Sequence, residues 1–432
     1  MRIVAAGLML NLLFNVMMAA RGFPYPYNWF LGDPRDWLAD FLKMGMSYPG
    51  DPVHRSGAPW YLQERLDQYQ WQIERLRGTP LNHFHMLPLS TLMGLLIRQA
   101  LSIADAGWVL VLVLGSVVAL LTAVVTRAVP AGRGRIAMGV VTIIAYPILF
   151  AIDRGHLFSL VCGTALVAGT LRSLKLGRAD AVSILLFAVA LNIRPNAGLI
   201  PLALFLFRRG WRFRDMVALG LATVALFLAA LGTAHAIYPE YHLASWLKGL
   251  SDYSKLYIVR DFGQSFNSSL FGALRALFGF QPWAYTVPLY VALGMFLATC
   301  MLAWRNALPD AALIFLTLSA YALGSQVFGD YHLIVFLIPV VMLAAGAKVD
   351  SATTRAVLVA SCLMLIPKNY IFQVDDEGML EWSWQVVINP LILLRFSVPL
   401  LWRGFRGVGG AQTEAAELPP GSPAAVLSST QA

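Results

Sequence analysis

The sequence has little charge, because only 13% of its 432 residues are Asp, Glu, Lys or Arg. A soluble globular domain carries about 25% charged residues. Hydrophobic residues make up 58% of the chain, and its mean hydropathy is +0.65. This balance excludes an ordinary soluble protein and predicts a polytopic membrane protein. The net charge of +9 then gives no sign of nucleic-acid binding, because cytoplasmic loops of membrane proteins collect Lys and Arg.

Cysteine is also scarce, and the common catalytic signatures are missing. Cys162, Cys300 and Cys362 all lie in apolar segments, so the sequence predicts neither a disulfide framework nor a metal site. It contains no Walker loop, no GxGxxG after a strand, no HExxH and no GxSxG. We therefore expect no nucleotide-binding fold, no metal and no cofactor.

The sequence is instead rich in long apolar segments, the first of which is residues 3–20. A signal peptide would give a similar pattern, but in a chain this apolar we expect an uncleaved first span. We predict an all-α, polytopic transmembrane helical bundle with about 12 spans, although several segments are shorter than the ~20 residues that a spanning helix needs. The other segments are residues 107–127, 136–152, 156–171, 181–192, 197–207, 216–238, 284–304, 311–328, 332–347, 355–367 and 386–401.

Positive charge predicts the orientation of this bundle. Residues 86–100 form a short apolar segment with Pro88. If this segment is not a full span, the basic short loops fall on the same side of the membrane as the N-terminus. We therefore expect that segment to be half-inserted or to lie on the surface, with both chain ends cytoplasmic. The opposite short turns hold only Arg154 and Arg194. The inward-facing residues are Arg127, Arg133, Arg135, Arg172, Lys175, Arg178, Arg208, Arg209, Arg212, Arg214, Arg305, Lys348, Arg403 and Arg406.

This orientation divides the chain into a membrane domain, residues 1–406, and a tail, residues 407–432. Residues 21–85 and 239–283 become long outer loops. The first carries a helical stripe that predicts amphipathic helices lying on the bilayer surface, formed by Leu62, Leu66, Tyr69, Ile73 and Leu76. The tail lacks a periodic apolar face, so we expect it to be disordered in the cytoplasm.

Acidic residues gather in the first outer loop. Asp33, Asp36 and Asp40 fall at i, i+3 and i+7, on one face of a helix that would begin at Pro34. Asp33 and Asp36 could be explained by helix capping and by the helix dipole alone. Asp40 lies beyond the first turn, where the dipole gives no benefit. We therefore interpret these three aspartates as candidate catalytic residues.

Two short outer turns place cations at membrane depth, where charge is costly and usually functional. The guanidinium of Arg194 suits a lipid phosphate at the level of the headgroups. The alternative is an arginine that anchors a helix end by snorkelling. Arg154 and His156 form the second candidate turn. For these, an ion pair with Asp153 and a satisfied interfacial polar residue are the alternatives.

Later outer turns add Gln264, Asn267 and His332 as candidate substrate-binding residues. Asn267 or Ser268 could instead be the N-cap of a helix that runs to Phe278. An outer carboxylate cluster and an arginine at headgroup depth indicate a lipid-linked substrate. If the donor is a sugar on a polyprenyl monophosphate, the site needs a base for the acceptor hydroxyl and a cation for the departing phosphate. A single displacement inverts the anomeric centre.

The chain resembles the C-superfamily of integral-membrane glycosyltransferases, and most closely family 87, the polyprenol-phosphate-mannose-dependent α-mannosyltransferases. The resemblance covers nearly the whole length except the tail. The matching motifs are Asp36-Trp37, Asp40-Phe41, Ser47-Tyr48-Pro49, Gly155-His156-Leu157-Phe158-Ser159-Leu160, Arg194-Pro195, Arg208-Arg209-Gly210-Trp211, Asn267-Ser268-Ser269-Leu270 and Tyr331-His332.

This resemblance implies a first-loop aspartate as base, with Asp36 ranked first, and outer cations that hold the lipid phosphate. It also implies mannose as the sugar and metal-independent transfer. Two positions depart from the family, which usually has Gln where His156 stands and Lys-Pro where Arg194-Pro195 stands. The second departure keeps the positive charge, whereas the first leaves the role of His156 open.

The sequence thus predicts a multi-pass enzyme of the bacterial inner membrane with its active site on the periplasmic or outer face. Its expected partners are a polyprenyl-phosphate-linked sugar donor, a lipid or glycan acceptor and membrane lipids, with no nucleic acid. One alternative is a polymerase or ligase that acts on a polyprenyl-diphosphate glycan. Another is a transporter or lipid flippase, although no internal repeat is visible and the ionisable residues sit at one face.

Overall fold

The computed structural model of the protein describes residues 87–103, 106–253, 267–279, 281–346, 351–368, 371–374 and 381–417. This part of the chain is all-α apart from one short hairpin, in which β1 (Ile371–Val374) pairs antiparallel with β2 (Glu381–Ser383). The first apolar segment, the whole of the first long loop, and residues 254–266 and 280 of the second lie outside the described residues.

The apolar segments predicted between residues 107 and 401 all lie on helices. Two further helices belong to the second long loop, α12 (Leu243–Tyr253) and α13 (Leu270–Phe278), and α4 (Pro88–Ile103) contains the short segment with Pro88. The others are α5 (Ala106–Ala128), α6 (Arg133–Ile144), α7 (Tyr146–Asp153), α8 (Leu157–Leu176), α9 (Ala181–Ile193), η3 (Pro195–Gly198), α10 (Leu199–Leu206), α11 (Phe213–Ile237), α14 (Trp283–Trp304), α15 (Asp310–Gly324), η6 (Asp330–Phe336), α16 (Leu337–Gly346), α17 (Ala352–Met364) and α18 (Trp384–Glu417).

One of these apolar segments is broken by a tertiary contact that the hydropathy pattern does not reveal, and a second break falls at the predicted turn between two segments. Residues 136–152 form α6 and α7, which meet at a bend of 40° around the extended residue Ala145. The break frees the backbone N–H of Tyr146, which donates to the carbonyl of Leu365 at 3.0 Å. The second break follows α9, because Arg194 precedes Pro195 and is held in an extended conformation.

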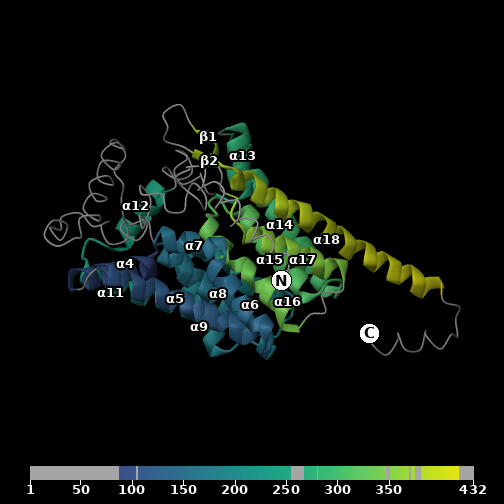
Figure 1. Ribbon diagram of the computed structural model, residues 1–432, viewed down its shortest axis with the longest axis horizontal. Helices are drawn as coiled ribbons and strands as arrows, with labels where there is room; N and C mark the ends of the chain where they lie inside the picture. The colour runs from purple at the N-terminus through teal and green to yellow at the C-terminus, as the bar shows by residue number, and fades with distance from the viewer. Residues whose placement is uncertain are drawn as a thin grey trace.

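The core of the bundle is the pair formed by α15 and the continuous segment η6–α16. Every residue of α15 from Ala311 to Leu323 is buried, and so is every residue of η6. The helices α8, α14, α17 and α18 pack around this pair. In Figure 1, α4 to α11 gather on one side, α14 to α17 lie on the other, and α18 extends beyond the bundle.

Helix α11 is the most exposed long helix of the described chain. Only 11% of its most apolar stretch is buried, and Leu221, Val224 and Leu228 face outward. An apolar helix surface of this kind would be unfavourable in water and is typical of a helix that faces lipid. Helix α4 covers the C-terminal part of α11 through Leu95, which packs with Ala234 and Tyr241.

Four described helices are long and apolar enough to cross a membrane: α8, α11, α14 and residues 384–406 of α18. The bent pair α6–α7 would make a fifth. The chain therefore has the helices of a membrane protein. The larger number of about twelve spans, the surface helices of the first loop and the position of α4 in the bilayer remain predictions.

The tail begins differently from our expectation. Helix α18 continues to Glu417, so residues 407–417 are helical where the sequence indicated a disordered tail. Local composition favours the helix only from residue 411 onward, where Ala411, Gln412, Glu414, Ala415 and Ala416 are good helix formers, because Gly407, Gly409 and Gly410 are poor ones. Residues 418–432 lie outside the described residues.

Candidate functional site

Several turns that are distant in sequence meet at one end of the bundle, which we call the polar end. Ser159 at the start of α8 lies 3.2 Å from His332 in η6, measured from Oγ to Nδ1. Arg194, after α9, donates from Nη1 to the carbonyl of Val327 at 3.3 Å. Asn267, before α13, forms a β-bridge with Gly329. The polar end therefore collects four of the turns that the sequence marked as functional.

His156 and His332 are brought close together at this end. The Nδ1 of His156 accepts a hydrogen bond from the backbone N–H of Ser159 at 3.2 Å, so this histidine is the N-cap of α8. Its ring stacks on Tyr331 with a centroid distance of 4.0 Å and lies 6.2 Å from the ring of His332. Because Nδ1 is the acceptor, a neutral His156 carries its proton on Nε2.

His332 is almost fully buried, with 6% of its surface exposed. Its Nδ1 faces Ser159, and within the described part of the chain its Nε2 has no hydrogen-bond partner. A buried imidazole nitrogen without a partner is unfavourable. The nitrogen is therefore a candidate contact for a hydroxyl or phosphate oxygen of a substrate.

Arg194 supplies a half-buried cation beside these histidines. Besides Val327, its guanidinium hydrogen-bonds the side chain of Tyr321, and it interacts electrostatically with His332. A guanidinium has five N–H donors, so these contacts orient it and leave capacity for an anion. The extended conformation before Pro195 directs the chain away from α9 at this residue.

Arg154 lies deeper than we expected for a residue of an outer turn. Only 5% of its surface is exposed, and its guanidinium carbon lies 5.3 Å from the ring centroid of Phe150. It also interacts electrostatically with Tyr146. These contacts suit a residue that stabilises the positions of α7 and η6, because Phe150 in turn stacks on Tyr331 at 5.9 Å.

The helix cap before α13 differs from the prediction that Asn267 or Ser268 would occupy it. The N-cap is Ser269, whose side chain accepts from the N–H of Gly272 at 3.0 Å. Asn267 is instead committed to the chain before η6, donating to the carbonyl of Gln326 at 2.7 Å and accepting from the N–H of Phe328 at 2.7 Å. Tertiary partners therefore outcompete the local cap.

A buried hydrogen-bond network surrounds Asp330, the first residue of η6, two positions before His332. Asp330 is fully buried and accepts from Ser268 Oγ at 2.5 Å and from the hydroxyl of Tyr146 at 3.1 Å. Gln385 at the start of α18 donates to the same carboxyl and to Tyr146. Asn389, one turn later, donates to Ser268 at 2.7 Å. The network joins α7, α13, η6 and α18.

Asp330 interacts electrostatically with Lys368, whose Nζ donates to the backbone carbonyls of Leu363 and Ile366. Burial raises the pKa of Asp330 to about 7, and burial lowers the pKa of Lys368 while the charge of Asp330 opposes that change. Both residues lie outside the four long apolar helices. The only sequence signal for this network was a lone aspartate between apolar segments.

Several predicted site residues lie outside the described residues, namely Gln264 and the three first-loop aspartates Asp33, Asp36 and Asp40. Their proposed roles remain predictions. In the part of the chain that the structure describes, no three His, Cys, Asp or Glu side chains are grouped so that they could hold a metal ion.

The polar end can therefore offer a substrate one half-buried guanidinium, two adjacent imidazoles and buried amide oxygens. Within the described ranges, Gln385 Oε1 and Asn389 Oδ1 are buried without a hydrogen-bond partner, as is His332 Nε2. The two amide oxygens can accept hydrogen bonds from the hydroxyls of a sugar-bearing ligand, and the imidazole and guanidinium N–H groups can donate to phosphate oxygens.

The comparisons with known proteins add no identification: no family model matches the chain, and neither does any curated protein or solved structure. The class that the fold defines is an all-α protein with several helices able to cross a membrane.

Proposed function

We propose that the protein is a membrane glycosyltransferase that moves a sugar from a polyprenyl-phosphate donor to a lipid or glycan acceptor. The observation that carries the proposal is Arg194 beside His156 and His332 at the polar end of an apolar bundle. A half-buried guanidinium next to lipid-facing helices is suited to the phosphate of a lipid-linked donor. Mannose is the sugar that the family resemblance suggests.

The reaction needs a base for the acceptor hydroxyl and a cation for the departing phosphate. A first-loop aspartate, Asp36 in our proposal, accepts the proton of the acceptor hydroxyl, and the acceptor oxygen forms a bond with the anomeric carbon. The bond from that carbon to the phosphate oxygen breaks, and polyprenyl phosphate leaves with the bonding electron pair. Arg194 balances the charge that develops on the phosphate. One displacement inverts the anomeric configuration.

The described contacts of Asp330 favour a positioning role over the role of catalytic base. Its carboxyl receives hydrogen bonds from Tyr146, Ser268 and Gln385, which occupy it with donors from three separate elements. A base must instead present a lone pair to the acceptor hydroxyl. Asp330 therefore fits a positioning residue that holds η6 and His332 in place.

The proposal includes an orientation and a location. The polar end faces the periplasm or cell exterior of a bacterial inner membrane, the bundle has about twelve spans, and both chain ends are cytoplasmic. Opposite the polar end, the structure has a second cluster of charge, in which Arg209 pairs with Asp310 at 2.6 Å and Arg172 pairs with Asp180 at 2.5 Å. An end rich in arginine favours the cytoplasmic side.

The decisive experiment uses purified protein in liposomes with radiolabelled polyprenyl-phosphate-mannose and a total lipid extract. We expect label to move to a new lipid or glycan product. Arg194→Ala should lower transfer by about 10- to 100-fold, because a charge-assisted hydrogen bond contributes roughly 1.5–3 kcal/mol. Arg194→Lys should keep substantial activity.

The matched control is Arg305→Ala, an exposed arginine that follows α14 at the opposite end. It should transfer label at the wild-type rate. If Arg194→Ala also transfers normally but is poorly expressed, Arg194 is an anchor for a helix end. No transfer by the wild type to any component of the extract, with donor intact, contradicts the proposed activity.

A further inference from the structure

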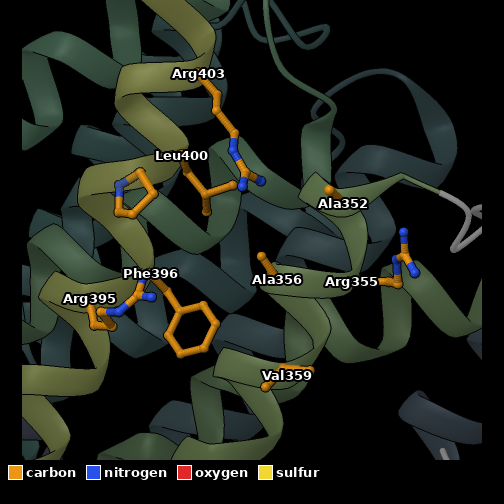
Figure 2. A pocket seen from close by; sticks show the side chains of 9 residues that line it. Ala352, Arg355, Ala356, Val359, Arg395, Phe396, Leu400 and Arg403 are labelled. Atoms are coloured by element: carbon orange, nitrogen blue, oxygen red, sulfur yellow. The ribbon is translucent and has the colours of Figure 1, made fainter.

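A cavity of about 320 Å³ lies between α17 and α18, far along α18 from the Asp330 network. Three arginines line it, Arg355 from α17 and Arg395 and Arg403 from α18. The rest of the wall is mainly apolar and includes Ala356, Phe396 and Leu400. Figure 2 shows Arg403 reaching from α18 to the space beside Leu400, with Arg355 on the opposite rim.

The cavity belongs to the arginine-rich end of the bundle. Arg403 precedes Gly404, and a Cβ added at Gly404 would lie 2.8 Å from Cδ1 of Leu302, close to the end of α14. Trp304, the last residue of α14, donates to the carbonyl of Leu206, which places the end of α10 beside it. The cavity, which we call the groove, therefore lies at the same end of the bundle as the basic turns.

Within the described ranges, the three guanidinium groups have no acidic side chain as a partner. Among the described residues, none of them has a hydrogen bond or an ion pair. The described acids at this end are engaged elsewhere. Asp180 binds Arg172, Asp310 binds Arg209, and Asp215 accepts from the backbone N–H of Arg212 and lies near Arg214.

Arg395 lies too deep on α18 to be explained as a residue at a helix end. It stands near the middle of the apolar stretch Trp384–Arg406, eleven residues after its start and eleven before its end. At about 1.5 Å per residue, it is some 16 Å from either end. A charge at that depth in an apolar helix is costly, and an anion within reach of its side chain would lower that cost.

We propose that this groove binds an anionic phospholipid of the bilayer, with its phosphate held by Arg403 and Arg355 near the arginine-rich end, Arg395 reaching toward it along the groove, and an acyl chain along Leu400 and Phe396. The positions 395, 399 and 403 share one face of α18, and 352, 355, 356 and 359 share one face of α17. A basic groove between apolar helices combines the two features that a lipid presents, a charged headgroup and a hydrocarbon chain. A soluble anion would use only the arginines and leave the apolar wall uncovered.

The test uses the full-length protein, delipidated in detergent, and native mass spectrometry. Phosphatidylglycerol and phosphatidylcholine with identical acyl chains serve as probes. We expect the wild type to retain phosphatidylglycerol in preference to phosphatidylcholine. In the double variant Arg395→Gln/Arg403→Gln, each arginine removed should lower phosphatidylglycerol binding by about fivefold. The control Arg133→Gln/Arg305→Gln removes two exposed arginines of the same end that lie outside the groove, and it should bind as the wild type does.

A second variant, Ala356→Phe, fills the groove while all three arginines remain, and it should also lose phosphatidylglycerol. Thermal unfolding in lipid-free detergent shows whether each variant is folded. Equal retention of the two lipids by the wild type overturns the proposal. So does an equal loss of binding in the Arg133/Arg305 control, because binding would then reflect the total charge of this end. The result is independent of sugar transfer, which is measured at the opposite end.

Discussion

Asp330 is the residue whose surroundings constrain the polar end most tightly. Its carboxyl receives donors from α7, from Ser268 just before α13 and from the start of α18, so one side chain joins segments that are separated by up to 239 residues. Removing a buried acceptor leaves each of its donors without a partner, and each buried unsatisfied group costs about 1–3 kcal/mol. Residues of this kind decide whether the neighbouring histidine and arginine are correctly placed.

The ionisation of Asp330 should appear in the stability of the protein. Its pKa rises from an ordinary value of 3.8 to about 7 because of burial, so the folded state favours the neutral carboxyl. The resulting stabilisation is complete below the unfolded pKa and is lost as the pH rises toward the folded pKa. Between about pH 5 and pH 8, the wild type should therefore lose stability relative to Asp330→Asn, which cannot ionise.

Thermal unfolding in one detergent across this pH range measures the effect. We expect the difference in Tm between Asp330→Asn and the wild type to move in favour of the variant by at least ~2 °C as the pH rises. Parallel pH profiles for the two proteins would contradict the buried-carboxyl interpretation.

The first-loop aspartates are tested by substitutions that keep their shape. Asp36→Asn cannot accept a proton, so a catalytic Asp36 predicts normal expression and transfer reduced by ~100-fold or more. A helix cap predicts instead a stability loss of ~1 kcal/mol or less with turnover intact. Asp33→Asn and Asp40→Asn are the matched controls, measured with the same radiolabelled donor. If one of these is inactive while Asp36→Asn retains more than about a tenth of the rate, the base is misassigned.

At the scale of elements, the close approach of α8 to η6 positions the two histidines. Gly163 lies one helical turn after Ser159, on the face of α8 that meets η6. A Cβ added there would lie 2.9 Å from Cγ2 of Ile334, a branched side chain that cannot easily move. The glycine therefore allows the contact between Ser159 and His332.

Two glycine substitutions in helices should have opposite effects. Gly163→Ala should destabilise the protein by about 1–3 kcal/mol through overpacking against Ile334. Gly220→Ala in α11 should stabilise it by about 0.5–1 kcal/mol, because nothing lies within 4 Å of the added Cβ and alanine favours a helix. Melting temperatures in the same detergent provide the comparison. A neutral Gly163→Ala would show that α8 and η6 are not tightly packed.

On the scale of the whole molecule, charge is distributed unequally between the two ends. The polar end has buried, hydrogen-bonded groups, whereas the opposite end carries exposed arginines at the start of α6 and in the turns after α8, α10 and α14. Because Lys and Arg in short loops determine orientation, this asymmetry predicts that the arginine-rich end is cytoplasmic.

Labelling of introduced cysteines tests that orientation. The three native cysteines are buried, so background labelling should be low. Gln281→Cys, at an exposed position before α14, should react with a membrane-impermeant maleimide in spheroplasts. Ala131→Cys, exposed between α5 and α6, should react only after the membrane is permeabilised. The reverse pattern would move the polar end, and the proposed active site, into the cytoplasm.

Composition and hydropathy alone were enough to indicate an all-α membrane protein and to place most of its helices. The helices of the described chain consist mainly of apolar residues. Apolar composition is a local property, so a short window of the sequence is enough to reveal it. The polar turns at Arg194, His156, Asn267 and His332 were also visible, because charge and amide groups between apolar segments are conspicuous. Their chemical roles are still predictions.

The tertiary structure decided those features that depend on residues far apart in the sequence. The break at Ala145 depends on the carbonyl of Leu365, the cap of α13 depends on Asn267 being occupied by Phe328, and the burial of Asp330 depends on Tyr146 and Gln385. Each of these outcomes is a competition between a local hydrogen bond and a partner far along the chain. The distant partner wins because a buried polar group without one costs more than a cap or a helical turn contributes.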